Sequence, residues 1–138
     1  MSARIMVVDD ESQVVRLLEV ILARAGYVVS KATSGKECLT LLRQETPDAI
    51  ILDIMMPDMS GLEVMGSLHT MYKDITLPPV IFLTADGSMD TMLRGLQSGA
   101  YKYLVKPTSR EKLIEVVRSA VDYGTAKRNP VIAPPDWM

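Results

Sequence analysis

Residues 6–13 read MVVDDESQ, a short apolar run that ends in two adjacent carboxylates, Asp9 and Asp10. Together with Ile5, the residues up to Val8 have the length and continuity of a buried strand. Two like charges directly after a buried strand repel each other unless something positive lies beside them. This stretch therefore predicts the first strand of a sheet and a cation near the end of that strand.

Four more apolar runs of strand length follow along the chain, and a helical pattern comes after each of the five runs. The runs cover residues 5–8, 27–29, 49–52, 80–83 and 103–105. Alternating strands and helices indicate parallel strands joined by right-handed crossovers, with helices on both faces of the sheet. The chain is therefore predicted to form an α/β fold, a doubly wound (βα)5 parallel sheet.

The order of the strands follows in part from which runs are apolar throughout. IMVV, AIIL and VIFL are continuously apolar, as central parallel strands are, whereas YVVSKAT and YKYLVK contain Ser, Lys and Tyr. The second and fifth strands are thus expected at the edges. This agrees with the flavodoxin-like order 2-1-3-4-5, whose binding crevice lies beyond the carboxyl ends of the strands, at the switch between strands 1 and 3.

Helix positions follow from capping pairs and apolar stripes. Three helix starts carry a serine or threonine followed three residues later by glutamate, a pair that can satisfy two backbone N–H groups of the first turn. These pairs are Ser34 with Glu37, Ser60 with Glu63, and Thr108 with Glu111. The first helix is expected to bury one face, made of Val14, Leu17, Leu18, Ile21, Leu22 and Ala25. Met89 and Met92 lie on a later helix and are expected in the core.

Length and composition fit one compact domain, because 138 residues with 48% apolar and 23% charged side chains can bury one core. The net charge of -2 and the lack of a long Lys/Arg run argue against direct binding to nucleic acid or to an anionic membrane. The first ten residues lack the features of a signal peptide, so a cytoplasmic protein is expected. The single cysteine, Cys38, excludes an internal disulfide and a cysteine-built zinc site.

The end of the chain differs from the rest because prolines interrupt it. We expect one domain over residues 1–124 and a Pro-containing tail or linker over residues 125–138, where Pro130, Pro134 and Pro135 break the helical pattern. Either the chain is a single domain with a short tail, or the sequence was cut from a longer protein just where a further module begins. The sequence leaves both readings open.

Polar residues stand at the carboxyl ends of four predicted strands: Asp9 and Asp10, Asp53, Thr84 and Lys106. Because these ends lie along one rim of a parallel sheet, the five side chains are expected to meet. Three carboxylates repel one another by about 4 kcal/mol per close pair at a surface-like dielectric, so they need a cation or protons. Oxygen ligands of this kind suit Mg²⁺. Capping of the first helix could explain one of the adjacent aspartates, but not their convergence with Asp53.

With these motifs in order, the chain resembles the receiver domain of two-component response regulators and is similar to the stand-alone chemotaxis-type regulators. The resemblance runs from about Arg4 to Val121. It is carried by VVDDE, LDIMMPDMSGLE, FLTA and GAYKYLVKP, and by the spacing between them. Each motif is weak alone, but all four in order on one (βα)5 chain are specific.

The resemblance implies a phosphorylation-controlled signalling module, and no enzyme beyond its own phosphorylation and dephosphorylation. Asp53 would accept a phosphoryl group from a histidine kinase or a phosphotransfer protein. Mg²⁺ would be bound by Asp10, Asp53 and the backbone carbonyl of Met55. Asp9 would reach the ion through water.

The resemblance also assigns the residues that bind the phosphate and respond to it. Lys106 would bind the phosphate, or pair with Asp53 before phosphorylation, and the Thr84 hydroxyl would donate to it. Tyr103 would turn inward as Thr84 moves, although composition alone favours a surface tyrosine. The family typically has a cis bond at Lys106–Pro107. The switched face would comprise the fourth helix, fifth strand and fifth helix, and would bind a downstream effector protein or domain, or a second copy in an activation-dependent dimer.

Two positions flanking the phosphate, Met55 and Asp86, are expected to set how long the signal lasts. Hydrolysis needs a water placed in line behind phosphorus, and a polar side chain two residues after the acceptor would help to orient it. Met55 cannot do so, and its thioether could shield the phosphoryl group. The charge of Asp86 lies near an anionic phosphate, so we expect Met55 to dominate.

Two alternative functions belong to other classes of protein. A phosphatase of the haloacid-dehalogenase type also uses an aspartate nucleophile with Mg²⁺, but it requires a second aspartate where this chain has Met55. A flavodoxin-like cofactor carrier requires Ser, Thr and Gly donors after the first strand, whereas DDES would repel a flavin phosphate. We therefore predict a receiver domain.

Overall fold

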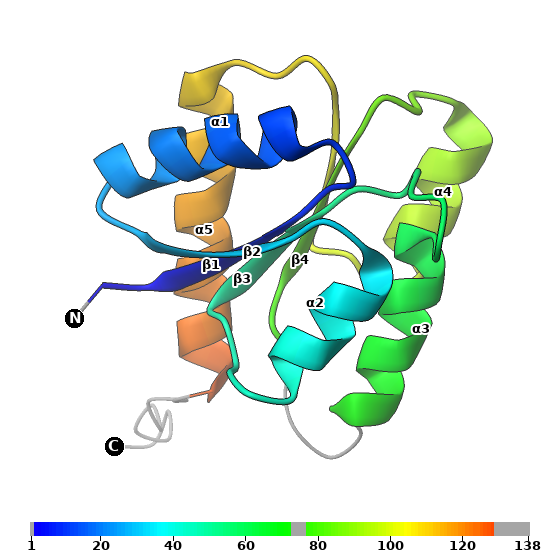
Figure 1. The fold of residues 1–138 in the computed structure, drawn as a ribbon, viewed down its shortest axis with the longest axis horizontal. Helices are drawn as coiled ribbons and strands as arrows, with labels where there is room; N and C mark the ends of the chain where they lie inside the picture. Colours follow the sequence, from blue (N-terminus) through cyan, green and yellow to red (C-terminus); the bar gives the residue numbers. More distant parts are fainter. Residues whose placement is uncertain (1, 73–76, 129–138) are drawn as a thin grey trace, which may run out of the picture.

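The computed structural model describes residues 2–72 and 77–128, and within them five strands alternate with five helices. The strands are β1 (Arg4–Val8), β2 (Val28–Ala32), β3 (Ala49–Leu52), β4 (Val80–Thr84) and β5 (Lys102–Val105). The helices are α1 (Ser12–Arg24), α2 (Gly35–Leu42), α3 (Gly61–Met71), α4 (Met89–Gln97) and α5 (Arg110–Arg128). Neighbouring strands are parallel in the order β2-β1-β3-β4-β5, which confirms the predicted fold (Figure 1).

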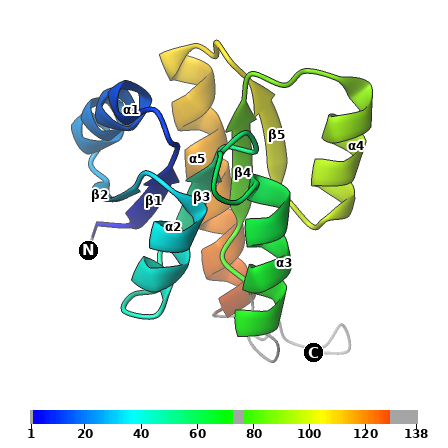
Figure 2. The ribbon, with the colours of Figure 1, turned by 45° about the vertical axis from the view of Figure 1, so that its right-hand side comes forward.

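Helices cover both faces of the sheet, with α1 and α5 on one face and α2, α3 and α4 on the other (Figures 1 and 2). Alternation along β1 splits the core in two: Ile5 and Val7 belong to the α1/α5 side, whereas Met6 and Val8 belong to the other. Every residue of β3 and β4 is buried, as their unbroken apolar sequences predict. Since a fully buried Val, Leu or Ile contributes about 1.5–3 kcal/mol, the central strands anchor the fold.

The edge strand β2 begins and ends later than the predicted 27–29. Tyr27 is not part of the strand because its N–H still donates to the Leu22 carbonyl at the end of α1. The strand then continues through Ser30 and Ala32, which are buried although Ser30 is polar. The apolar run thus located this strand but predicted neither its first nor its last residue.

The buried face of α1 is narrower than the sequence predicted. It consists of Val15, Leu18 and Leu22, at steps of three and four, whereas Leu17 is 60% exposed. A helix that packs on only one side of a sheet buries a narrow arc, so the outer residues of a wide apolar stripe remain in solvent. The exposed part of this stripe faces α5.

The helix caps confirm one predicted capping box fully. At the start of α3, the Ser60 hydroxyl accepts the N–H of Glu63, and the Glu63 carboxylate accepts the N–H of Ser60. At the start of α2, Ser34 accepts the N–H of Glu37, but the Glu37 carboxylate bonds the N–H of Thr33 instead. That helix start is capped, but without the reciprocal bond.

The predicted cap of α5 is wrong by one residue. Ser109, not Thr108, accepts the N–H of Lys112 in the first turn. The helix runs to Arg128 and so includes the first four residues of the expected tail, while residues 129–138 lie outside the described part. None of the described helices is long and apolar enough to cross a membrane.

Gly61, the first residue of α3, lies against the backbone that follows β3. Its N–H donates to the Ile54 carbonyl, and a Cβ at this position would lie 2.4 Å from the Asp53 carbonyl oxygen. Backbone atoms cannot rotate out of the way as a side chain can. The close approach therefore fixes the start of α3 against the residue that ends β3.

We expect Gly61→Ala to lower the free energy of unfolding by about 1–3 kcal/mol, because the new methyl group overlaps backbone. Gly66→Ala on the same helix is the matched control: no atom lies within 4 Å of its added Cβ, so better helix propensity should raise stability by up to about 1 kcal/mol. Urea unfolding followed by circular dichroism measures both variants. Equal effects in the two variants would contradict the steric explanation.

Candidate functional site

Three aspartates meet where β1 and β3 end, because these strands are neighbours in the sheet. One carboxylate oxygen from each of Asp9, Asp10 and Asp53 lies within 4.8 Å of the others. Asp9 and Asp53 are buried, with 2% and 4% exposure, while Asp10 is exposed. The convergence predicted from the strand ends is confirmed, and among the described residues this is the one acidic cluster with metal-ligand spacing.

Lys106 reaches this cluster from the end of β5, across the width of the sheet. Its ammonium lies 2.6 Å from Asp9 Oδ2 and 3.4 Å from Asp53 Oδ2. The expected ion pair with Asp53 is therefore present, and the lysine makes a second, shorter contact with Asp9 that the sequence did not predict. The Lys106–Pro107 peptide is cis, in agreement with the resemblance.

The charges of the cluster are only partly balanced. Burial raises the pKa of Asp9, the hydrogen bonds from Lys106 and the Glu11 N–H oppose that rise, and the negative charge of Asp53 adds to it. Partial burial lowers the pKa of Lys106, but its bond to Asp9 and the charge of Asp53 outweigh this and raise it. One firmly protonated lysine thus faces three carboxylates, an arrangement that favours a further cation.

Asp53 and Asp9 differ in how their oxygens are occupied. Asp9 Oδ1 accepts the Glu11 N–H at 2.9 Å, and its Oδ2 takes the short bond from Lys106. Asp53 Oδ1 accepts the N–H of Met55 at 3.2 Å, and its Oδ2 has only the longer lysine contact. Among the described residues, Asp53 therefore carries the less strongly bound carboxylate oxygen.

Thr84 ends β4 on the same rim and is fully buried. Its carbonyl accepts the N–H of Lys106 at 2.8 Å, and its hydroxyl oxygen accepts the N–H of Asp86 at 3.3 Å. The hydroxyl hydrogen remains available as a donor. Thr84 thus connects the lysine-bearing loop with the loop that leads into α4.

Tyr103 lies in the middle of β5 and points inward. Its side chain is 9% exposed, its ring packs at a tilt against Phe82, and its hydroxyl donates to the Asp86 carbonyl at 2.6 Å. The surface position favoured by composition is therefore wrong for this structure. The inward turn on phosphorylation that the resemblance implies stays a prediction. The Asp86 carboxylate accepts the N–H of Ser88, and its hydrogen bonds to Ser88 and Thr91 lower its pKa.

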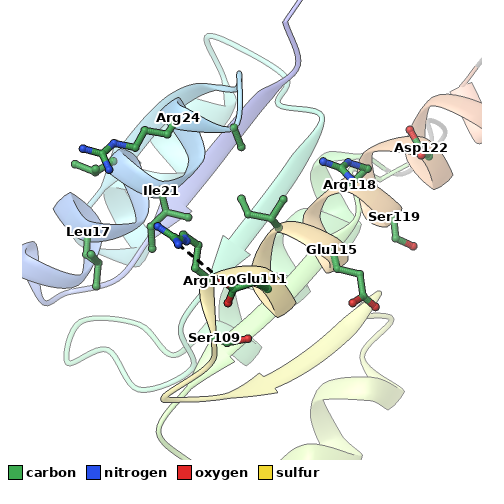
Figure 3. A pocket seen from close by; sticks show the side chains of 13 residues that line it. Leu17, Ile21, Arg24, Ser109, Arg110, Glu111, Glu115, Arg118, Ser119 and Asp122 are labelled. Carbon is green, nitrogen blue, oxygen red and sulfur yellow. Dashed lines mark ion pairs between the residues drawn. The ribbon is translucent and has the colours of Figure 1, made fainter.

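A groove lies elsewhere, between α1 and α5 (Figure 3). Its walls combine apolar side chains such as Leu17 and Ile21 with charged ones, including an ion pair between Arg110 and Glu111 at 3.7 Å. The groove contains neither the aspartate cluster nor Lys106. The candidate site is therefore the aspartate cluster at the carboxyl ends of the strands, and the groove lies outside it.

Comparisons with known proteins agree with this geometry. The chain is 42% identical over 118 residues to the transcriptional regulatory protein PrrA of Mycobacterium leprae, covering 86% of this chain and 49% of that protein. A CheY-like receiver domain from Methanospirillum hungatei superposes with a TM-score of 0.83 at 27% identity, covering 91% and 98% of the two chains. Chemotaxis protein CheY4 of Vibrio cholerae gives 0.79 at 30% identity, covering 87% and 99%.

The chain spans about half the length of the curated relatives that it matches, so the likeness to them concerns one domain. The family profile described as "Response regulator receiver domain" matches residues 5–118, which run from β1 to the first half of α5. This match favours the receiver domain over both alternative functions, the haloacid-dehalogenase-type phosphatase and the flavodoxin-like cofactor carrier. The chain belongs to the response regulator receiver domain family, and is a phosphorylation-controlled regulatory module and not a catalytic enzyme.

Proposed function

We propose that Asp53 is the residue at which this receiver domain is phosphorylated. The observation that carries the proposal is the difference in occupancy: Asp53 Oδ2 has one contact at 3.4 Å, whereas both oxygens of Asp9 are held at 2.9 Å or less. Asp10 is exposed to solvent, which would hydrate its charge and weaken it as a nucleophile. Asp53 thus combines burial, a neighbouring cation and an oxygen with a single long contact.

The phosphoryl donor is a histidine kinase or a phosphotransfer protein, since receiver domains are partners of such kinases. Asp53 Oδ2 forms a bond to phosphorus while the bond between phosphorus and the donor histidine breaks, and the histidine nitrogen takes up a proton. The product is an acyl phosphate. The Lys106 ammonium then pairs with the phosphoryl oxygens instead of the carboxylates, and the Thr84 hydroxyl donates a hydrogen bond to one of these oxygens.

Mg²⁺ is the metal that best suits this site. The donor set consists of three carboxylates within 4.8 Å of one another, with no thiol or imidazole among them. Asp10, Asp53 and the carbonyl of Met55 would bind the ion, and Asp9 would hold one of its waters. When bound, Mg²⁺ supplies positive charge that neutralises the phosphoryl oxygens.

The output face is formed by α4, β5 and α5. The sequence analysis placed Met89 in the core, but it is 68% exposed, and Leu93 and Leu96 follow it on the outside of α4. Val105 extends this apolar surface onto β5. We assign the face to a downstream effector protein or domain, or to a second copy on activation, with Thr84 and Tyr103 as the switch residues.

The first test concerns the acceptor. Incubation with acetyl phosphate and Mg²⁺ should add one phosphoryl group to the wild-type protein, detected by intact-mass spectrometry, and Asp53→Asn should abolish the addition. Chelation of the metal should abolish it as well. Asp122→Asn, which changes an exposed aspartate of α5, is the matched control and should load normally. Undiminished loading of Asp53→Asn would exclude Asp53 as the acceptor.

The second test uses the raised pKa of Asp9. The folded protein binds the proton of the Asp9 carboxyl more tightly than the unfolded chain does. Protonated Asp9 therefore stabilises the fold below the ordinary pKa of 3.8, and this contribution is lost as the pH rises through the pKa of Asp9 in the folded state. Asp9→Asn avoids that loss and can still accept a bond from Lys106. Without metal, its stability advantage over wild type should therefore grow as the pH rises from about 3.8 towards neutrality.

Mg²⁺ should reverse this order at neutral pH, because it stabilises the wild type in proportion to its affinity and the variant less. Thermal unfolding at several pH values, with chelator or with Mg²⁺, measures both effects. An advantage of Asp9→Asn that stayed constant with pH would show that the ionised carboxylate is not strained.

The third test concerns the lifetime of the acyl phosphate. Met55 is 57% exposed beside Asp53, whereas the Asp86 carboxylate is engaged by Ser88 at the start of α4. Met55→Asn or Met55→Glu should therefore shorten the half-life by supplying a group that orients water. Loss of phosphate is followed after removal of the donor. Unchanged half-lives in both Met55 variants, together with a clear change in Asp86→Ala, would make Asp86 the controlling residue.

A further inference from the structure

Gly95 is the one residue of α4 that is buried, and it lies in the interior of the helix. A glycine at such a position is less favourable than alanine by about 1 kcal/mol. The flanking residues Leu93 and Leu96 are exposed, so most of α4 contributes little to the core. Met92 packs partly against the core, but the only fully buried position of α4 is occupied by glycine, which disfavours a helix more than any residue except proline.

The reason for glycine lies in the ring of Tyr103. A Cβ at position 95 would lie 3.0 and 3.1 Å from two carbons of that ring, and 3.3 Å from a carbon of Phe82. Phe82 is fully buried in β4, whereas Tyr103 retains 9% exposure at the edge of the sheet. An added methyl group would therefore be relieved by rotating Tyr103 towards solvent.

The buried ring is joined to the phosphorylation site by two hydrogen bonds. The Tyr103 hydroxyl donates to the Asp86 carbonyl, and the Asp86 N–H donates to the Thr84 hydroxyl oxygen. Both bonds anchor the loop that precedes α4. Rotation of the ring to the outside would break the first bond and place a large aromatic group on the surface between β5 and α4.

We propose that Gly95 is a positioning residue: because it has no side chain, it leaves room for the inward ring of Tyr103. Gly95 thereby sets the fraction of molecules in which this ring is buried at the α4–β5 face. The consequence for signalling rests on the output face proposed above. The steric part does not, because it concerns the unphosphorylated protein. Gly95 acts through Tyr103 and touches neither the aspartates nor Lys106.

The test compares Gly95→Ala with Gly66→Ala, which adds the same methyl group to a helix where nothing lies within 4 Å of it. Aromatic NMR of the unphosphorylated proteins should show contacts between the rings of Tyr103 and Phe82 in wild type and Gly66→Ala, and their loss in Gly95→Ala. Burial is the first cause that raises the pKa of Tyr103, so its phenol should titrate closer to its ordinary value in Gly95→Ala alone.

A double-mutant cycle separates this role from ordinary packing. In a Tyr103→Ala background the slot is empty, so Gly95→Ala should become as stabilising as Gly66→Ala; in the wild-type background it should be less stabilising or destabilising. Ring contacts that persist in Gly95→Ala, or equal stability effects in both backgrounds, would overturn the proposal. None of the ring and stability readings depends on whether Asp53 is the acceptor.

Discussion

The structure depends on the incompletely neutralised carboxylates at the ends of β1 and β3. Asp9 and Asp53 are buried beside each other, and the only described ammonium in contact with them comes from Lys106, nearly a hundred residues along the chain. Burial in a low dielectric makes both the repulsion and the lysine contact strong. A cluster of this kind needs Lys106, another cation or protons to offset the repulsion between its carboxylates, and the proposed metal binding and phosphorylation would use that need.

The fold supplies this arrangement because strand order and chain order differ. β1 pairs with β3, so Asp9 and Asp53 meet at the ends of neighbouring strands although they are more than forty residues apart in the chain. β4 and β5 then bring Thr84 and Lys106 to the same rim. The close approach of Gly61 to the backbone of Asp53 fixes the next helix there. Central strands supply stability, and their ends supply the chemistry.

Much of this site could be predicted from sequence because it depends on where apolar runs stop. The convergence of Asp9, Asp10 and Asp53 follows from period and order alone, before any side-chain geometry is known. The preference of Lys106 for Asp9 could not be predicted, since two carboxylates compete at distances set by rotamers. Ser109 replaced Thr108 as a cap for a similar reason: adjacent hydroxyl residues read alike until the backbone direction is fixed. Met89 was wrongly predicted to lie in the core, because the sequence of a short amphipathic helix does not indicate which face packs against the sheet.

The position of Tyr103 shows how a local glycine can carry information that no motif contains. Nothing in the spacing of Gly95 relates it to a residue eight positions later, because the contact is made across the turn from α4 into β5. Yet the ring occupies space that any other side chain at position 95 would contest, while its hydroxyl holds the loop attached to Thr84. A change at the phosphate end of this chain of contacts and a change at the glycine end act on the same ring. If the proposed output face binds a partner, its affinity would therefore be set jointly by the chemistry at the rim and by the packing behind the helix.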